Sequence, residues 1–138
     1  MFEYTREVFY YETDKMGVVH HSNYVRWLEE SRMAYFNHAG LPYAETEEHG
    51  VMIPVTNMNL KFKLFCRFGD TFTVRVRMIK YSGVRFDMAY TVVNQLGQTV
   101  LEAVTGHAFV GKDHRPLALP KALPERHEGM ARLLEPLV

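Results

Sequence analysis

The chain has 138 residues, with 16 lysines and arginines against 16 aspartates and glutamates, and therefore no formal net charge at pH 7. This length predicts one domain over residues 1–138, and the neutral balance argues against a nucleic-acid-binding domain, which is normally basic overall. Cys66 is the only cysteine, so we expect neither an intramolecular disulfide nor a cysteine-rich metal site. No apolar run approaches the roughly 20 residues of a membrane span, and the N-terminus is unlike a signal peptide. We therefore expect a soluble, cytoplasmic protein.

The first predicted elements are a strand, a polar loop and a long helix. Loosely alternating side chains predict the strand over 2–10, and the loop runs from about 12 to 21. Apolar side chains then recur at helical spacing, which predicts the long helix over 22–39. Ser22 is the expected N-cap of this helix, and Gly40 stands where a C′ residue belongs.

Period-two alternation takes over after an acidic turn or short helix at 42–50. It predicts strands at about 51–64, 72–78, 84–92 and 100–110. In the first of these the phase slips near Thr56 and Asn57, which is typical of a bulge or bend. Pro124 opens a terminal helix, whose apolar face comprises Met130, Leu133, Leu134 and Leu137.

The order of these elements is strand, long helix, four hairpin-linked strands and a short C-terminal helix. Such an order predicts an α+β fold in which a curved, five-stranded antiparallel sheet wraps around the long helix. The other face and the edges of that sheet are left partly uncovered, so we also expect a homo-oligomer.

The polar loop holds the candidate chemistry. A loop carboxylate is usually solvated or caps a helix, but this loop leads directly into a helix start, which offers unpaired backbone N–H groups and a partial charge of roughly +0.5. Asp14 could therefore act as a base toward water, or attack an acyl carbon itself, while the backbone N–H of His21 polarises the substrate carbonyl. His20 and His21 lack further ligands at zinc spacing, so no metal is expected.

Basic residues are concentrated in one window of the predicted strands, in which Asp70 is the only acidic residue. Each alone is best read as part of a solvated face. As a group they suit an anionic ligand such as a nucleotide phosphate tail. The window contains Lys61, Lys63, Arg67, Arg75, Arg77, Lys80 and Arg85.

The segment from Tyr11 to Tyr24, with Thr13-Asp14 followed by Gly17-Val18-Val19 and His21, resembles the signature of the hydroxybenzoyl-CoA thioesterase-like hotdog-fold family, in particular its bacterial acyl-CoA thioesterase branch. The later strand order and the Arg67–Asp70 turn agree with this resemblance. One position departs from the signature, since His20 stands where the family usually has an aromatic residue, commonly tyrosine.

The resemblance implies an enzyme that hydrolyses an acyl-CoA thioester to the free acid and CoA. It assigns catalysis to Asp14, as general base or nucleophile, and to His21. It implies dimers with shared active sites, with a dimer of dimers as the expected assembly, and no cofactor, because the CoA thioester is the substrate. The implied substrate-binding residues are Gly17, Val18, Asn23, Tyr24, Thr56 and Asn57, the last two from the second protomer, and the implied CoA-binding residues are Ser82, Gly83 and Arg85.

Two alternatives remain open at this point. The acyl group could be carried by acyl carrier protein instead of CoA, or the domain could bind acyl-CoA without hydrolysing it, because a fold alone does not determine activity. The identity of the acyl group is also open, since Met16, Tyr24 and Trp27 would suit an aliphatic or an aromatic pocket.

Overall fold

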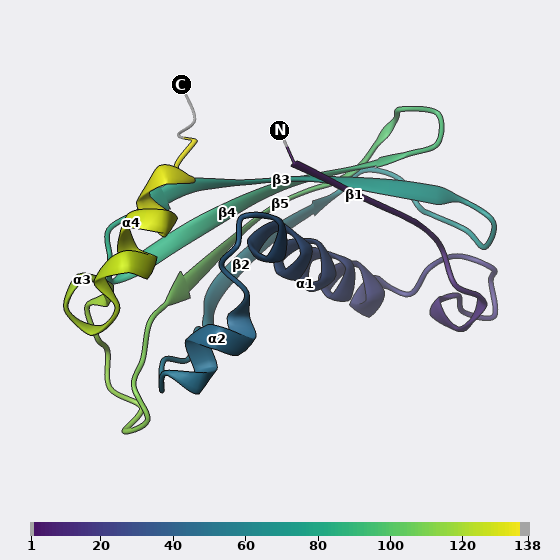
Figure 1. Cartoon of the computed structure of the whole chain (residues 1–138). Coiled ribbons are helices and arrows are strands. Elements are labelled where there is room, and N and C mark those ends of the chain that lie inside the picture. The colour runs from purple at the N-terminus through teal and green to yellow at the C-terminus, as the bar shows by residue number, and fades with distance from the viewer. Residues whose placement is uncertain (1, 136–138) are drawn as a thin grey trace. The chain divides into compact units, whose positions relative to one another are not determined.

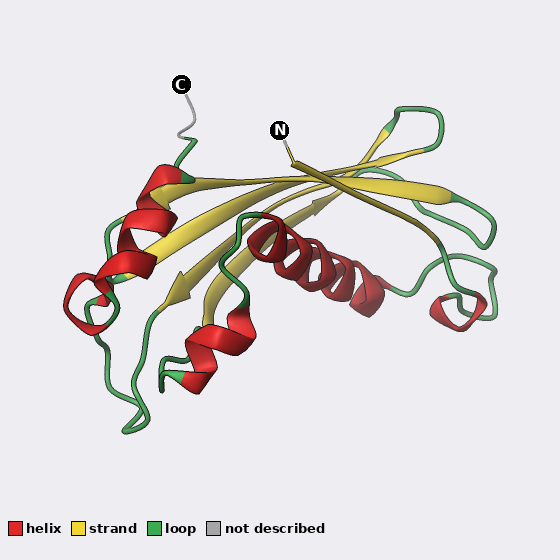
Figure 2. Ribbon diagram, in the orientation of Figure 1, coloured by secondary structure: helices red, strands yellow, loops and turns green. Residues whose placement is uncertain are grey.

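The computed structural model describes residues 2–135, and Figure 1 follows the chain through its elements. The predicted α+β class is confirmed (Figure 2). Leu137, assigned above to the apolar face of the terminal helix, lies outside the described residues. The elements are β1 (Phe2–Glu7), η1 (Tyr10–Glu12), α1 (His21–His38), α2 (Tyr43–Glu48), β2 (Val55–Phe62), β3 (Thr71–Tyr81), β4 (Arg85–Asn94), β5 (Thr99–Ala108), α3 (Leu119–Ala122) and α4 (Pro124–Arg132).

The five strands form one sheet in the order β1-β3-β4-β5-β2. The pairing of β1 with β3 is antiparallel, with Phe2 opposite Val76. Short turns join β3 to β4 and β4 to β5, and neighbouring strands joined in this way run antiparallel. Strand β2 occupies the edge beside β5, where an antiparallel bridge between Met52 and Val110 extends their pairing.

The chain divides into two compact units, and β2, β3, β4 and β5 each contribute residues to both. Unit 1 contains the chain up to Tyr35, Leu60–Val76 and Tyr90–Ala103. Unit 2 contains Phe36–Asn59, Arg77–Ala89 and the chain from Val104 on.

Unit 1 is built around Trp27 of α1, whose side chain is 0% exposed. Its ring stacks on that of Phe72 in β3, with centroids 3.7 Å apart and planes 9° apart. Tyr24, one helical turn earlier, meets the edge of the indole at 4.8 Å. The alternating residues Phe72, Val74 and Val76 are all buried, as the period-two pattern predicts. Aromatic burial of this kind dominates the energetics of a small core.

Unit 2 has its own aromatic core, centred on Phe86 of β4. This ring stacks on that of the buried His107 of β5, with ring centroids 4.7 Å apart. Its centroid lies 5.9 Å from that of Phe36 at the end of α1. The C-terminal helix α4 is tied to this core at its edge, because the hydroxyl of Tyr81 lies 2.7 Å from Nδ1 of His127. Burial raises the pKa of Tyr81 to about 12, so this hydroxyl stays protonated at neutral pH.

Several predicted boundaries are wrong. Strand β1 ends at Glu7 instead of residue 10, because the chain turns into η1. Helix α1 begins at His21, one residue before the predicted N-cap Ser22. The strand predicted over 51–64 begins only at Val55 and ends at Phe62, since Pro54 has no N–H to pair and interrupts the ladder after the isolated Met52 bridge.

Replacing Trp27 by alanine should lower the free energy of unfolding by about 3–5 kcal/mol, because the change empties the centre of unit 1. Urea titration followed by circular dichroism would measure this loss. Leu96→Ala, at an exposed side chain in the β4–β5 turn, is the control and should stay within about 0.5 kcal/mol of the parent. Equal effects of the two changes would contradict the central place of Trp27.

Candidate active site

The loop between η1 and α1 forms a small hairpin that presents Asp14 at its turn. Thr13 and Val19 form an antiparallel bridge at its base. The N–H of Asp14 donates to the carbonyl of Val18 at 2.8 Å, and the N–H of Gly17 donates to the carbonyl of Asp14 at 3.0 Å. Gly17 has φ +78°, a conformation that glycine adopts without steric cost. The glycine in the motif is therefore what permits so tight a turn after Asp14.

The side chain of Asp14 is oriented by its own turn. Its Oδ1 accepts hydrogen bonds from the backbone N–H groups of Met16 at 2.8 Å and Val18 at 3.4 Å. Within residues 2–135 no hydrogen bond engages Oδ2, and the side chain is exposed. One carboxylate oxygen is thus held by the loop, while the other is available to a water or an acyl carbon.

The start of α1 lies at the other end of the same loop. The N–H of Ser22 donates to Nδ1 of His20 at 3.3 Å, so the His20 ring, not the Ser22 hydroxyl, caps the helix. This ring also packs beside that of His21, with centroids 4.2 Å apart. Among the described residues no acceptor engages the backbone N–H of His21. The first amide of the helix is therefore open, as an oxyanion donor has to be.

A shallow hollow of about 490 Å³ lies beside the catalytic candidate. It is lined by Tyr10, Tyr11, Thr13, Asp14 and Lys15. His21 is not among the lining residues, and its side chain is exposed. Around Asp14, the single chain therefore offers an open surface and not an enclosed acyl pocket.

The loop is fastened to the turn before β3 through Cys66. The N–H of Val19 donates to the carbonyl of Cys66 at 2.8 Å, and the hydroxyl of Tyr24 accepts from the N–H of Cys66 at 3.1 Å. Tyr24, an implied substrate-binding residue, is thus buried and makes a structural contact. Burial, and secondarily the charge of Asp70, raises the pKa of the Cys66 thiol to about 12. A thiol of this kind is not a nucleophile at neutral pH.

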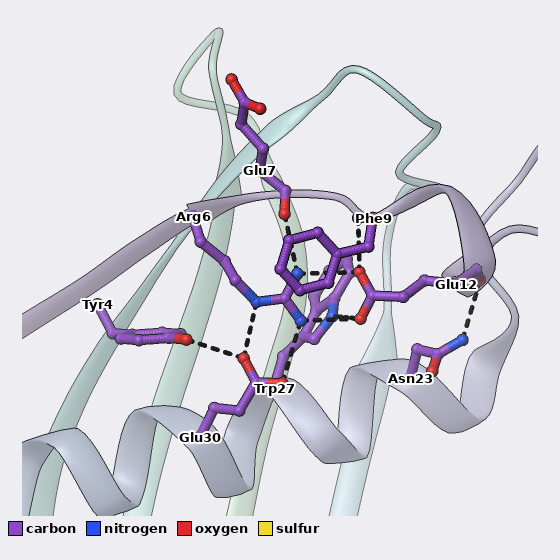
Figure 3. A network of polar contacts seen from close by, with 8 residues as sticks. All are labelled: Tyr4, Arg6, Glu7, Phe9, Glu12, Asn23, Trp27 and Glu30. Carbon is purple, nitrogen blue, oxygen red and sulfur yellow. Dashed lines mark hydrogen bonds and ion pairs between the residues drawn. The ribbon is translucent and has the colours of Figure 1, made fainter.

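A buried ionic network, which the sequence patterns do not predict, lies at the base of the loop (Figure 3). Glu12 is only 2% exposed, and Arg6 of β1 bonds to both of its carboxylate oxygens at 2.9 and 2.8 Å. Arg6 also donates to Glu30 of α1, at 2.8 Å from Nε, and Glu30 accepts a bond from the hydroxyl of Tyr4. The available signal was that Arg6 shares its strand face with apolar side chains, which indicates an inward-facing cation that needs a partner.

Three groups besides the arginine hold Glu12. The indole N–H of Trp27 donates to Oε2 at 2.8 Å, and the backbone N–H of Phe9 donates to Oε1 at 2.8 Å. The side-chain amide of Asn23 donates to the Glu12 carbonyl at 2.9 Å, so this implied substrate-binding residue is buried and committed to the loop. Burial opposes ionisation of Glu12, but the bonds from Arg6, Trp27 and Phe9 outweigh it and lower its pKa below the ordinary value.

The implied wall residues Thr56 and Asn57 lie exposed on β2, with their side-chain oxygens 2.9 Å apart. Asn57 covers Gly106 of β5 so closely that a Cβ at Gly106 would collide with the Asn57 side-chain oxygen. The pair therefore has a defined place at the edge of the sheet.

The side chain of Ser82 closes the turn that the family resemblance assigns to CoA binding. Ser82 Oγ accepts from the N–H of Arg85 at 3.0 Å, and both residues are exposed. Gly83 is buried, with φ +86°, and a Cβ there would lie 3.0 Å from Pro120. Ser82 and Arg85 are thus open to a ligand, whereas Gly83 lies under the C-terminal segment.

In the part of the chain that the structure describes, no cluster of three or more histidine, cysteine or acidic side chains could hold a metal ion. None of the helices in residues 2–135 has the length and hydropathy needed to cross a membrane.

The fold and the loop together define a thioesterase-like domain, and comparison with known proteins agrees. Residues 8–127 match the family described as the Thioesterase-like superfamily. A Bacillus subtilis protein with the provisional name acyl-CoA thioesterase YneP is 34% identical over 122 residues, or 88% of each chain. The 1,4-dihydroxy-2-naphthoyl-CoA hydrolase of Thermosynechococcus vestitus is 29% identical over 126 residues, covering 88% of this chain and 85% of that protein.

Among solved structures, a DHNA-CoA thioesterase from Staphylococcus aureus superimposes with a TM-score of 0.90 at 31% identity, covering 94% of this chain and 88% of that one. The chain belongs to the Thioesterase-like superfamily, whose hotdog fold it shares.

The depressed pKa of Glu12 predicts a specific loss of stability in acid. Its contribution is complete above the ordinary glutamate pKa of 4.5 and is lost as the pH falls through the lower pKa of the folded state. Urea titrations from pH 7 to pH 3 should therefore show the gap in unfolding free energy between the parent and Glu12→Gln shrinking below about pH 4.5. The exposed Glu102→Gln serves as the charge control. A difference in unfolding free energy that does not change with pH would contradict the lowered pKa of Glu12.

Proposed function

We propose that this chain hydrolyses acyl-CoA thioesters to the free acid and CoA. The observation that carries the proposal is the loop hairpin, which holds one oxygen of Asp14 and leaves the other exposed, next to a helix whose first amide is open. The similarity to proteins named as CoA thioesterases supports the same chemistry. The CoA moiety arrives with the substrate, so the reaction requires no separate cofactor.

In the proposed mechanism, Asp14 either removes a proton from water or attacks the thioester carbonyl itself. Attack at the carbonyl carbon converts its oxygen into an oxyanion, and the backbone N–H of His21 stabilises that charge at the positive end of α1. Loss of an oxyanion donor elsewhere costs about 2.7–4 kcal/mol, so this open amide is a major part of the proposed catalysis. Collapse of the intermediate breaks the C–S bond. If Asp14 acted as base, the proton that it took from water passes to the departing sulfur, and the free acid and CoA are released. If Asp14 acted as nucleophile, CoA leaves as a thiolate that takes a proton from water, and a water molecule then hydrolyses the mixed anhydride on Asp14 to the free acid.

We propose that the working enzyme is a homodimer, assembled further into a dimer of dimers, in which a second copy closes the open site around Asp14. Strand β2 is one edge of the sheet, and several of its apolar side chains are exposed in the single chain, with Met58 43% and Phe62 50% exposed. An edge strand with uncovered apolar side chains is suited to pairing with another copy. In this arrangement Thr56 and Asn57 of β2 contribute to the wall of the partner's site.

The proposed substrate contacts extend outward from Asp14. Gly17 and Val18 shape the loop around the acyl group, and the exposed Ser82 and Arg85 meet the CoA phosphates. We place the reaction in the cytoplasm, because the single cysteine is a buried free thiol and reducing compartments keep thiols reduced.

Asp14→Asn should lower the rate of CoA release by about 10²–10⁴-fold, because it removes the base or nucleophile. Binding of a non-hydrolysable acyl-CoA thioether should persist, since the fold does not depend on this exposed side chain. A free-thiol assay and isothermal calorimetry would measure the two quantities. Hydrolysis by the variant at near the parent rate would disprove the mechanism.

A panel of acyl groups, each presented on CoA and on acyl carrier protein, tests the carrier. We expect faster turnover on CoA for at least one acyl group, with CoA release followed by thiol titration. Faster turnover throughout on carrier protein would assign the other carrier. Binding of acyl-CoA without hydrolysis of any member would identify the chain as a binding module.

A mixing experiment tests the shared site. Asp14→Asn and Asn57→Ala chains would be unfolded together and refolded, so that hybrid dimers carry one site with both native residues. We expect the mixture to hydrolyse acyl-CoA faster than the mean of the two separate samples. The matched control mixes Asp14→Asn with the double variant and should gain nothing. A mixture that equals the mean would place Asp14 and Asn57 of the same chain in one site.

A further inference from the structure

Glu12 is a carboxylate with every bonding direction occupied. Within the described residues its two oxygens accept four hydrogen bonds, two from Arg6 and one each from Trp27 and the Phe9 backbone. These donors come from β1, from the turn into η1 and from α1. Since the side chain is 2% exposed, water does not compete for these bonds. The side chain thus fixes residue 12 relative to a strand on one side and the long helix on the other.

The backbone of Glu12 holds the far end of the same loop. Its carbonyl accepts the N–H of His20 at 3.0 Å and the side-chain amide of Asn23 at 2.9 Å. Residue 12 stands two positions before Asp14, and residue 20 stands one position before His21. A single residue therefore determines where the loop departs from the base and where it returns to the helix.

The ion pair between Arg6 and Glu12 fixes the geometry of the loop more than it adds to the stability of the protein. A buried ion pair contributes little more to stability than apolar side chains of the same size would, because both charges lose their hydration. The ion pair does restrict the relative orientation of the groups that it joins, since each of its hydrogen bonds has a preferred length and angle. The hydroxyl of Tyr4 and the second carboxylate, Glu30, orient Arg6 from the other side. The network thus holds Arg6 and Glu12 in one fixed relative orientation.

We propose that Glu12 is a positioning residue, which places the Asp14 carboxylate and the His21 amide in one frame without touching substrate. This inference rests on the proposed thioesterase function of the same loop. A misplacement of reacting groups by about 1 Å costs on the order of 10²-fold in rate. Loss of Glu12 therefore lowers kcat and leaves KM for acyl-CoA nearly unchanged.

The matched pair of variants is Glu12→Gln and Glu30→Gln. Both remove a carboxylate that Arg6 binds, but only Glu12 contacts the loop. We expect Glu12→Gln to lower kcat by about 10–10²-fold, with KM within about twofold of the parent. We expect Glu30→Gln to retain kcat within about twofold even where its melting temperature falls, since its bonds do not reach the loop. Equal losses of kcat in the two variants would overturn the proposal.

A double-variant cycle separates positioning from general damage. Because Glu12 acts partly through Asp14, Glu12→Gln costs less rate in an Asp14→Asn background than in the parent, since one of the two groups that it positions is already gone. Additive losses would overturn the proposal. A parent chain with no hydrolytic activity would instead remove the proposed function, which is a distinct outcome.

Amide hydrogen exchange provides a readout that does not depend on activity. In Glu12→Gln the amides of residues 13–20 should exchange at least about tenfold faster than in the parent and in Glu30→Gln, because the base of the loop has lost its anchor. Should Glu12→Gln fail to fold, Trp27→Phe removes a single bond to Oε2 and keeps a ring against Phe72. Faster exchange in that loop, together with a lower kcat, is again expected. Unchanged exchange and unchanged kcat would overturn the proposal.

Discussion

The contact between Arg6 and Glu12 is the constraint on which the rest of unit 1 depends. It joins the first strand to the segment that carries the catalytic candidate, and the same carboxylate reaches the indole at the centre of the core. Burying two charges is favourable only when each is fully hydrogen-bonded, and here the carboxylate is. Removing one partner leaves an uncompensated charge in the interior, which costs about 3–5 kcal/mol in other proteins. The base of the loop is therefore held by contacts that are costly to break.

The exposed groups around this anchor have a different character. Asp14 is held through one oxygen, His21 offers an open amide, and β2 leaves its apolar side chains at an uncovered edge. Together these features describe a chain with a complete core and an open surface around Asp14. Rigidity at the base and openness at the tip suit the proposed reaction at a site shared between two protomers.

Much of the fold follows from local patterns. The alternation of Phe72, Val74 and Val76 and the helical spacing before Gly40 depend on neighbours in sequence, so the sequence predicts these elements and their order. The motif loop was also found in this way, because Asp14, Gly17 and His21 lie within one short segment.

The contacts that could not be predicted join distant segments. Tyr24 meets Cys66 and Trp27 meets Glu12, and no periodic pattern records which side chain will lie beside which. The family resemblance implies substrate contacts for Asn23 and Tyr24, and the structure shows their polar atoms bonded within the protein. The start of α1 was missed by one residue because a histidine ring caps it, a role more often filled by a hydroxyl or carboxylate.

The contact between Asn57 and Gly106 links two positions on neighbouring strands. Residue 106 has no space for a methyl group as long as the amide of residue 57 lies over it. A methyl group at residue 106 therefore requires the exposed side chain of Asn57 to turn away or to become shorter. The side chains tolerated at these two positions of neighbouring strands are thus coupled, so a change at one alters which residues fit at the other.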